Sequence, residues 1–207
     1  MKTNRILLGL VTLALLSCHK KPATKTLPCC QKDGAVAGMA SQPASGSTSI
    51  YQLTGTWTDQ HGKQLILNTL QGRPQIVAMI FTHCTSVCPR VVEEMKTIRD
   101  SLPAAFRKKV GGVLVSFDPD RDTPVRMRLF AKQRQLDEQW ELLQGSADQV
   151  RELSMALNVS YQKLSGGDFS HSGNIFILDQ AGNIVQVVDG LNGNVRNADS
   201  VLCRLLR

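Results

Sequence analysis

The fold of this chain is decided by residues 76–89, Ile76-Val77-Ala78-Met79-Ile80-Phe81-Thr82-His83-Cys84-Thr85-Ser86-Val87-Cys88-Pro89. The first six residues are apolar without a break, which is typical of a strand that is buried on both faces of a sheet. Apolar residues then recur at helical spacing, at Val91, Val92, Met95, Ile98 and Leu102. The segment therefore predicts a strand, a short loop with two cysteines and a helix in direct succession.

The same alternation continues downstream. Val110 to Phe117 predicts a second buried strand, followed by Asp118-Pro119-Asp120-Arg121-Asp122-Thr123-Pro124. Thr123 and Pro124 are typical of an N-cap and a first helical residue, so we expect a helix to about Gln135. Trp140 to Leu143 predicts a short strand. After it, Ser146 and Gln149 fit a capping box that begins a helix ending near Leu157.

Hairpins are expected at both ends of this alternating region. Trp57 to Leu67 predicts the first, because Asp59-Gln60-His61-Gly62 supplies turn residues. Ile175 to Leu178 and Ile184 to Val188 predict the second, and a final amphipathic helix covers about Asn194 to Leu206. This order indicates an α/β, thioredoxin-like fold, with a central mixed β-sheet flanked by helices and an N-terminal β-hairpin.

The N-terminal residues indicate export. Lys2 and Arg5 precede an apolar run from Ile6 to Leu16, which is too short to cross a bilayer that needs roughly 20 helical residues. Residues 1–17 therefore fit a signal peptide. Leu15-Leu16-Ser17-Cys18 resembles the lipobox of bacterial lipoproteins, although an ordinary cleaved signal with an incidental cysteine is the alternative. We expect Cys18 to be lipidated and the protein to be anchored to a bacterial membrane on its periplasmic side.

Residues 18–49 are rich in small and polar residues and predict a flexible tether, so the folded domain is expected at residues 50–207. The leader and tether also hold most of the formal net charge of +7. No dense stripe of Lys and Arg with interleaved aromatic residues occurs, so the sequence gives no support for nucleic-acid binding.

The cysteines that suggest chemistry are Cys84 and Cys88. Pro89 restrains Cys88 to an extended or N-cap conformation and suits the first helical turn itself. The pair is therefore expected in a loop at the carboxyl edge of the sheet, where α/β folds bind their ligands. The positive end of the helix favours thiolates. Thiolates serve both metal binding and disulfide chemistry, and the loop does not choose between them.

Three features favour copper. The spacing is C-x-x-x-C, whereas thioredoxin-type redox motifs are C-x-x-C. His171 lies in a loop just before the strand at Ile175, from which it could reach the same edge. Two thiolates and one imidazole form a soft set of few ligands that suits Cu(I) and can also hold Cu(II), whereas structural zinc normally has four protein ligands.

The three motifs, His83 to Pro89, Asp118 to Pro124, and His171-Ser172 before Ile175 to Asp179, resemble in order and spacing the Sco/SenC family of copper chaperones. The resemblance covers residues 50–207. It implies a thioredoxin-like fold that binds copper through Cys84, Cys88 and His171 and helps to assemble the dinuclear copper site of cytochrome c oxidase. Asp118 matches a family aspartate, and the resemblance implies that it lies beside the ligands or faces a partner rather than binding the metal itself. One departure is Thr85-Ser86, where the family commonly has Pro-Asp.

Alternative functions stay open. Cys84 and Cys88 could form a redox disulfide in a thiol–disulfide oxidoreductase that acts on exported or membrane-protein cysteines without copper delivery, and both roles could coexist. A structural disulfide is a further alternative. A peroxiredoxin-like peroxidase fits less well, because its peroxidatic cysteine normally follows a Pro-Thr pair. As a copper chaperone for an oxidase subunit or another cuproprotein, the chain is not a turnover enzyme.

The other candidate residues have simpler interpretations. His83 should point away from Cys84 by strand alternation, and His61 should be solvated in its turn. Asp118, Asp120 and Asp122 are expected in turns and caps, because the prolines and the missing Gly and Glu exclude an EF-hand. Cys203 is expected to be a small buried residue. Cys29 and Cys30, adjacent in the tether, are possible accessory metal ligands.

Overall fold

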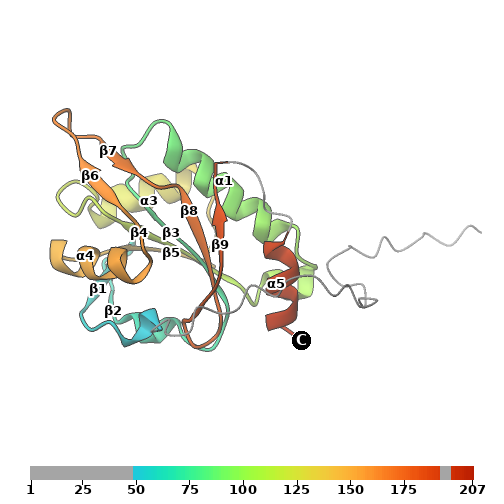
Figure 1. Cartoon of the computed structure of the whole chain (residues 1–207). Coiled ribbons are helices and arrows are strands. Elements are labelled where there is room, and N and C mark those ends of the chain that lie inside the picture. The colour runs from blue at the N-terminus through green and yellow to red at the C-terminus, as the bar shows by residue number, and fades with distance from the viewer. Residues whose placement is uncertain (1–48, 192–196) are drawn as a thin grey trace, which may run out of the picture.

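The computed structural model describes residues 49–191 and 197–207 (Figure 1). The predicted signal peptide, the lipidated Cys18, Cys29, Cys30 and the tether up to residue 48 lie outside the described residues. Within the described ranges, no helix has both the length and the apolar composition that crossing a bilayer requires.

Most described strands belong to one mixed, seven-stranded sheet with the order β2-β1-β5-β4-β3-β8-β9. The strands β3, β4 and β5 are parallel, and β8 runs antiparallel beside β3. Every residue of β3 and β4 is buried, as the continuous apolar runs predict. The bounds are β1 (Trp57–Asp59), β2 (Gln64–Leu65), β3 (Gln75–Ile80), β4 (Gly111–Ser116), β5 (Trp140–Gln144), β8 (Asn174–Leu178) and β9 (Ile184–Asp189).

Helices cover both faces of this sheet. Because α1 (Val87–Asp100) and α3 (Pro124–Gln133) connect parallel strands that follow one another across the sheet, right-handed crossovers place both on one face. The helix α5 (Ala198–Leu205) packs against α1 and β9 on that side. Figure 1 shows α4 (Ala147–Ala156) on the opposite side of the sheet. Short helices complete the fold: η2 (Ile50–Gln52), η3 (Leu67–Leu70) and α2 (Ala104–Arg107).

A second sheet of two strands was not expected from the sequence. The strands β6 (Tyr161–Lys163) and β7 (Phe169–His171) form a hairpin that lies near the N-terminus of α1 (Figure 1). Both strands are mostly exposed or half-buried, so no apolar run marks them. His171 is therefore the last residue of a strand, whereas the sequence placed it in a loop.

The thioredoxin-like α/β fold is confirmed, as are both predicted hairpins and the two predicted helix caps. The Thr123 hydroxyl accepts a hydrogen bond from the Arg126 amide, and Ser146 with Gln149 forms the capping box. The C-terminal helix begins at Ala198 rather than near Asn194, which lies outside the described residues. Cys203 is fully buried in α5, as expected.

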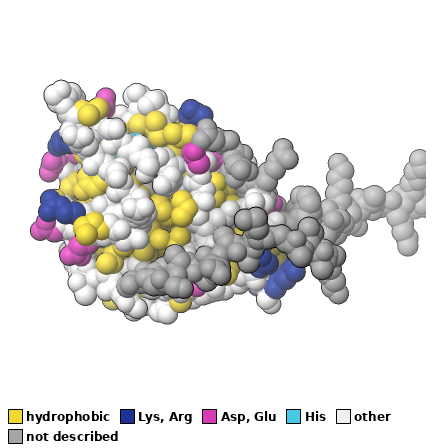
Figure 2. Space-filling model, viewed as in Figure 1, with side chains coloured by type: hydrophobic (Ala, Val, Ile, Leu, Met, Phe, Trp, Pro, Cys, Tyr) yellow, Lys and Arg dark blue, Asp and Glu magenta, His cyan; other side chains and the backbone are white. Residues whose placement is uncertain are grey.

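The face of the domain in Figure 2 has apolar side chains across its centre, and Lys and Arg side chains lie apart from one another around them. Its apolar surface is the ordinary consequence of a domain that has too little polar area to cover itself. On the part of this face that is not covered by undescribed residues, positive charge is therefore dispersed.

Candidate metal centre

The carboxyl ends of β3 and β4 bring two loops side by side. Ile80 and Ser116, the last residues of these parallel strands, are register partners, so the loops after Phe81 and Phe117 leave the sheet together. The antiparallel strand β8 begins at the same edge, where Ile175 pairs with Ala78. The residues just before β8 therefore reach the loop that holds the two cysteines.

The cysteine loop ends earlier than the sequence predicted. The helix α1 begins at Val87, so Cys88 lies in its first turn rather than in an extended or N-cap position. Ser86 precedes the helix without capping it through its side chain. Instead, the Cys88 amide donates a hydrogen bond to Cys84 Sγ at 3.3 Å. Cys84 thus satisfies a helix N–H that would otherwise lack a partner, which stabilises the early helix start despite Pro89.

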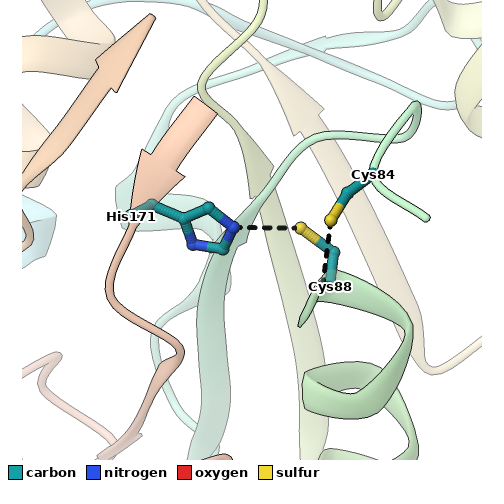
Figure 3. A group of neighbouring side chains, drawn as sticks. All are labelled: Cys84, Cys88 and His171. Carbon is teal, nitrogen blue, oxygen red and sulfur yellow. Dashed lines mark hydrogen bonds between the residues drawn. The ribbon is translucent and has the colours of Figure 1, made fainter. Parts of the chain in front are cut away.

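The three residues singled out from the sequence meet at this helix end. Figure 3 shows the side chains of His171, from β7, and Cys84, from the loop, converging on Cys88. Cys88 Sγ lies 3.5 Å from His171 Nε2. One donor atom from each residue lies within 4.8 Å of the other two. The proximity that the sequence predicted is therefore present in the fold.

The orientation of His171 leaves one ring nitrogen available. Its Nδ1 atom lies 2.9 Å from the carbonyl oxygen of Ser172. Since a carbonyl can only accept, Nδ1 is the nitrogen that donates to it, and the other ring nitrogen, Nε2, faces Cys88. Phe117 and Phe81 pack against the ring, with centroids 4.9 and 6.0 Å away. These contacts fix the imidazole before any ligand arrives.

The two thiols differ in acidity because they share one hydrogen bond. The Cys88 thiol donates to Cys84 and, with the backbone N–H groups of residues 86–88, lowers the pKa of Cys84 to about 4, against the opposing effect of burial. The same hydrogen bond and burial raise the pKa of Cys88. The reduced pair therefore holds one thiolate, on Cys84, at neutral pH.

The donor set fits a soft metal ion. Three donors at about 2.3 Å from one ion are about 4 Å apart, so the separations below 4.8 Å require only small side-chain movements. Two sulfurs and one imidazole nitrogen favour Cu(I), which accepts few ligands. The assignment of Cys84, Cys88 and His171 as ligands stays a prediction that the geometry permits.

Arg121 ties the hairpin of His171 to the loop after β4. Its guanidinium donates from Nε to the buried carboxylate of Asp118 and from Nη2 to the carbonyl oxygen of Gly167, between β6 and β7. It also lies over the ring of Phe81, 6.0 Å from its centroid. Asp118 is thus connected, through Arg121, to the hairpin that carries His171. The sequence offered no signal for Arg121 beyond its place in the motif.

Asp122, in the loop after β4, connects this loop to the loop after β3. Its buried carboxylate accepts hydrogen bonds from the Thr82 amide at 2.9 Å and hydroxyl at 2.5 Å, and from the Ser116 hydroxyl at 2.6 Å. The sequence predicted only turn or cap roles for this residue. Arg126 donates to the hydroxyl and carbonyl oxygens of Thr82 and reinforces the junction.

The other candidate histidines and aspartates at residues 49–191 lie outside the thiolate group. His83 faces Asp122, with Nδ1 3.3 Å from Oδ1, and its side chain is 39% exposed. His61 is exposed in its turn, as expected. Asp120 is exposed and pairs with Lys163 of the hairpin. The predictions for Cys29 and Cys30 lie outside the described residues.

The geometry agrees with comparisons to known proteins. A protein of Stutzerimonas stutzeri that is named for copper binding is 32% identical over 130 residues, which cover 61% of this chain and 63% of that protein. The chain thus spans less than two thirds of this relative. A SCO1 protein homolog of Bacillus subtilis is 25% identical over 142 residues, which cover 66% of this chain and 72% of that protein.

Solved structures are similar over most of the domain. A SCO1/SenC family lipoprotein from Bacillus anthracis has a TM-score of 0.68 and 26% identity, covering 75% of this chain and 94% of that one. Bradyrhizobium japonicum ScoI with copper bound has a TM-score of 0.62 and 27% identity, covering 72% of this chain and 96% of that one. The SCO1/SenC family model matches residues 45–206. The chain therefore belongs to the SCO1/SenC family.

Proposed function

We propose that this chain is a copper chaperone that binds one copper ion through Cys84, Cys88 and His171 and delivers it to the dinuclear copper site of cytochrome c oxidase. The observation that carries the proposal is the convergence of two sulfurs and an imidazole nitrogen within 4.8 Å of one another. A copper-bound family member of similar fold supports copper as the cargo.

The site suits delivery as well as uptake. Cys84 comes from a loop, Cys88 from a helix end and His171 from a hairpin, so three separate segments hold the ion. A site with three protein ligands leaves room for an incoming thiolate of the acceptor to bind before the original ligands leave. Copper then passes by ligand exchange, without free ions in solution.

The location of the protein is part of the proposal. A lipid on Cys18 would hold the domain at the periplasmic side of a bacterial membrane, beside the membrane-bound oxidase. The description of the similar Bacillus anthracis protein as a lipoprotein supports this anchor.

A second function is favoured by the acidity of Cys84. Its thiolate could attack a disulfide of the acceptor, breaking the S–S bond and forming a mixed disulfide. Cys88 would then lose its proton and attack Cys84 Sγ, which releases the acceptor as a dithiol and leaves a Cys84–Cys88 disulfide. Two electrons pass from the chain to the acceptor, so this reduction would prepare the acceptor cysteines for copper.

A transfer experiment separates the two functions. Reduced, Cu(I)-loaded full-length chain is mixed with a reduced, copper-free domain that carries the dinuclear site, and copper in the acceptor is measured after separation. Transfer should fail for His171→Ala, with His61→Ala as the matched control. Reduction of an oxidised acceptor should survive in His171→Ala and fail in Cys84→Ser. Full copper transfer by His171→Ala would contradict the proposed copper site.

A further inference from the structure

The group formed by His83, Asp118 and Asp122 is separate from the thiolate site. One donor atom of each residue lies within 4.8 Å of the other two. His83 follows β3, whereas the two aspartates follow β4. Because β3 and β4 are adjacent parallel strands, their carboxyl ends bring these three side chains to one edge.

An ordinary hydrogen-bond network does not account for all the donor atoms in this group. Asp118 is 1% exposed, and its Oδ1 atom has no hydrogen-bond partner among the described residues, while Arg121 holds the other oxygen of the carboxylate. A buried carboxylate oxygen without a donor is costly. The absence of a donor is explained if Asp118 Oδ1 binds a cation that enters from solvent.

The other two residues place further donor atoms beside this carboxylate. Asp122 Oδ1 accepts from the Thr82 hydroxyl, and His83 Nδ1 lies 3.3 Å from this oxygen, longer than a strong charge-assisted hydrogen bond. The exposed ring of His83 gives the group access to solvent. Arg121 donates to Asp118 Oδ2 and Arg126 donates to the carbonyl oxygen of Thr82. Neither guanidinium is therefore hydrogen-bonded to Asp118 Oδ1 or to Asp122 Oδ1.

We propose that His83, Asp118 and Asp122 form a second cation site that binds Cu(II) through one imidazole nitrogen and two carboxylate oxygens. Nitrogen and oxygen donors suit Cu(II), which binds such sites most tightly among the common divalent ions of the first transition row. Oxidation of Cys84 and Cys88 to a disulfide leaves these donors unchanged. The oxidised chain therefore loses the thiolate site but keeps the site of His83, Asp118 and Asp122.

The test uses the full-length chain without the thiolate site. The background replaces Cys18, Cys29, Cys30, Cys84 and Cys88 by Ser and His171 by Ala, and Cu(II) alone is the probe. We expect one Cu(II) per chain, a pulsed electron paramagnetic resonance signal from a coordinated imidazole, and no thiolate charge-transfer absorption. Because Cys84, Cys88 and His171 are absent, the result does not depend on the proposed copper-delivery site.

Single changes in this background identify the ligands. His83→Ala and Asp118→Asn should each lose the bound ion and, for His83→Ala, the imidazole signal. His61→Ala, which removes another exposed histidine, should retain both. His83→Ala changes an exposed ring, so it decides the question even if Asp118→Asn fails to fold. Absence of Cu(II) binding in the background, or its retention by His83→Ala, would overturn the second site.

Discussion

The Nε2 atom of His171 lies 3.5 Å from Sγ of Cys88, although 83 positions separate the two residues in the chain. Two features of the fold produce this contact. The antiparallel strand β8 begins at the edge where β3 ends, and the β6–β7 hairpin folds back over the aromatic rings of Phe81 and Phe117. The contact joins the N-terminal end of α1 to the β6–β7 hairpin.

Reactivity of Cys84 should be almost independent of pH above about 6, because its pKa is lowered to about 4. Thiolate is the reactive form, so the alkylation rate should fall only as the pH falls toward 4. The measurement is the iodoacetamide rate at Cys84 in the reduced chain, read by mass spectrometry. Cys88→Ala removes the donated hydrogen bond and should move the midpoint upward. A tenfold rise per pH unit between 6 and 8 in the unaltered chain would contradict the thiolate assignment.

Arg121→Ala should weaken copper binding about tenfold to a hundredfold, the usual effect of losing a group that orients a metal ligand. The change frees Gly167 and with it the hairpin that holds His171. Competition with a chelator of known affinity measures the loss, and amide hydrogen exchange across residues 161–171 should rise. If Arg121→Ala binds copper as tightly as the unaltered chain, the hydrogen bond from Arg121 to Gly167 is not needed to position His171.

Lys163→Ala provides the matched control for Arg121→Ala. Lys163 also joins the hairpin to the loop after β4, through Asp120, but this ion pair is largely exposed. Exposed pairs contribute little. Copper affinity and hydrogen exchange should therefore stay close to those of the unaltered chain.

Asp122→Ala should lower the free energy of unfolding by about 3 kcal/mol, because it leaves buried donors of Thr82 and Ser116 without an acceptor. Urea unfolding of the reduced, metal-free chain measures the loss. Asp120→Ala, at an exposed position in the same loop, should change stability by less than about 0.5 kcal/mol. Equal effects of the two changes would show that Asp122 is not the buried junction of the loops.

Lipidation of Cys18 predicts a covalent acyl chain and membrane association in a bacterial host. Metabolic labelling with a fatty acid that carries an alkyne should label the unaltered chain and fail to label Cys18→Ala. Recovery of label in Cys18→Ala, or an unlabelled chain free in the periplasm, would support the alternative of an ordinary cleaved signal peptide.

The sequence predicted the buried strands and the capped helices well. Their signals are local: continuous apolar runs mark the strands, and the pairs Thr123-Pro124 and Ser146–Gln149 mark the helix starts. The sequence missed the β6–β7 hairpin, since its strands are only three residues long and no residue in them is fully buried. A usable signal was the turn sequence Ser165-Gly166-Gly167-Asp168 between Tyr161 and Phe169. The helix start at Val87 was missed because the Cys84 sulfur replaces an ordinary cap.

The candidate ligands of the site could be predicted from the sequence, whereas the residues that hold them in place could not. The motif spacing and the family resemblance brought together Cys84, Cys88 and His171. The roles of Arg121 and Asp122 depend on contacts between loops that are distant in sequence, such as Arg121 with Gly167 and Asp122 with Thr82. Such contacts follow from strand register and hairpin placement, which local sequence patterns do not specify.

The most direct test of the central claim is X-ray absorption spectroscopy of copper in the reduced full-length chain loaded with one Cu(I), in a Cys29→Ser and Cys30→Ser background. We expect two sulfur ligands and one imidazole nitrogen per copper, with one sulfur fewer in Cys84→Ser and no imidazole in His171→Ala. An imidazole contribution that persists in His171→Ala, or two sulfurs that persist in Cys84→Ser, would contradict this assignment of ligands.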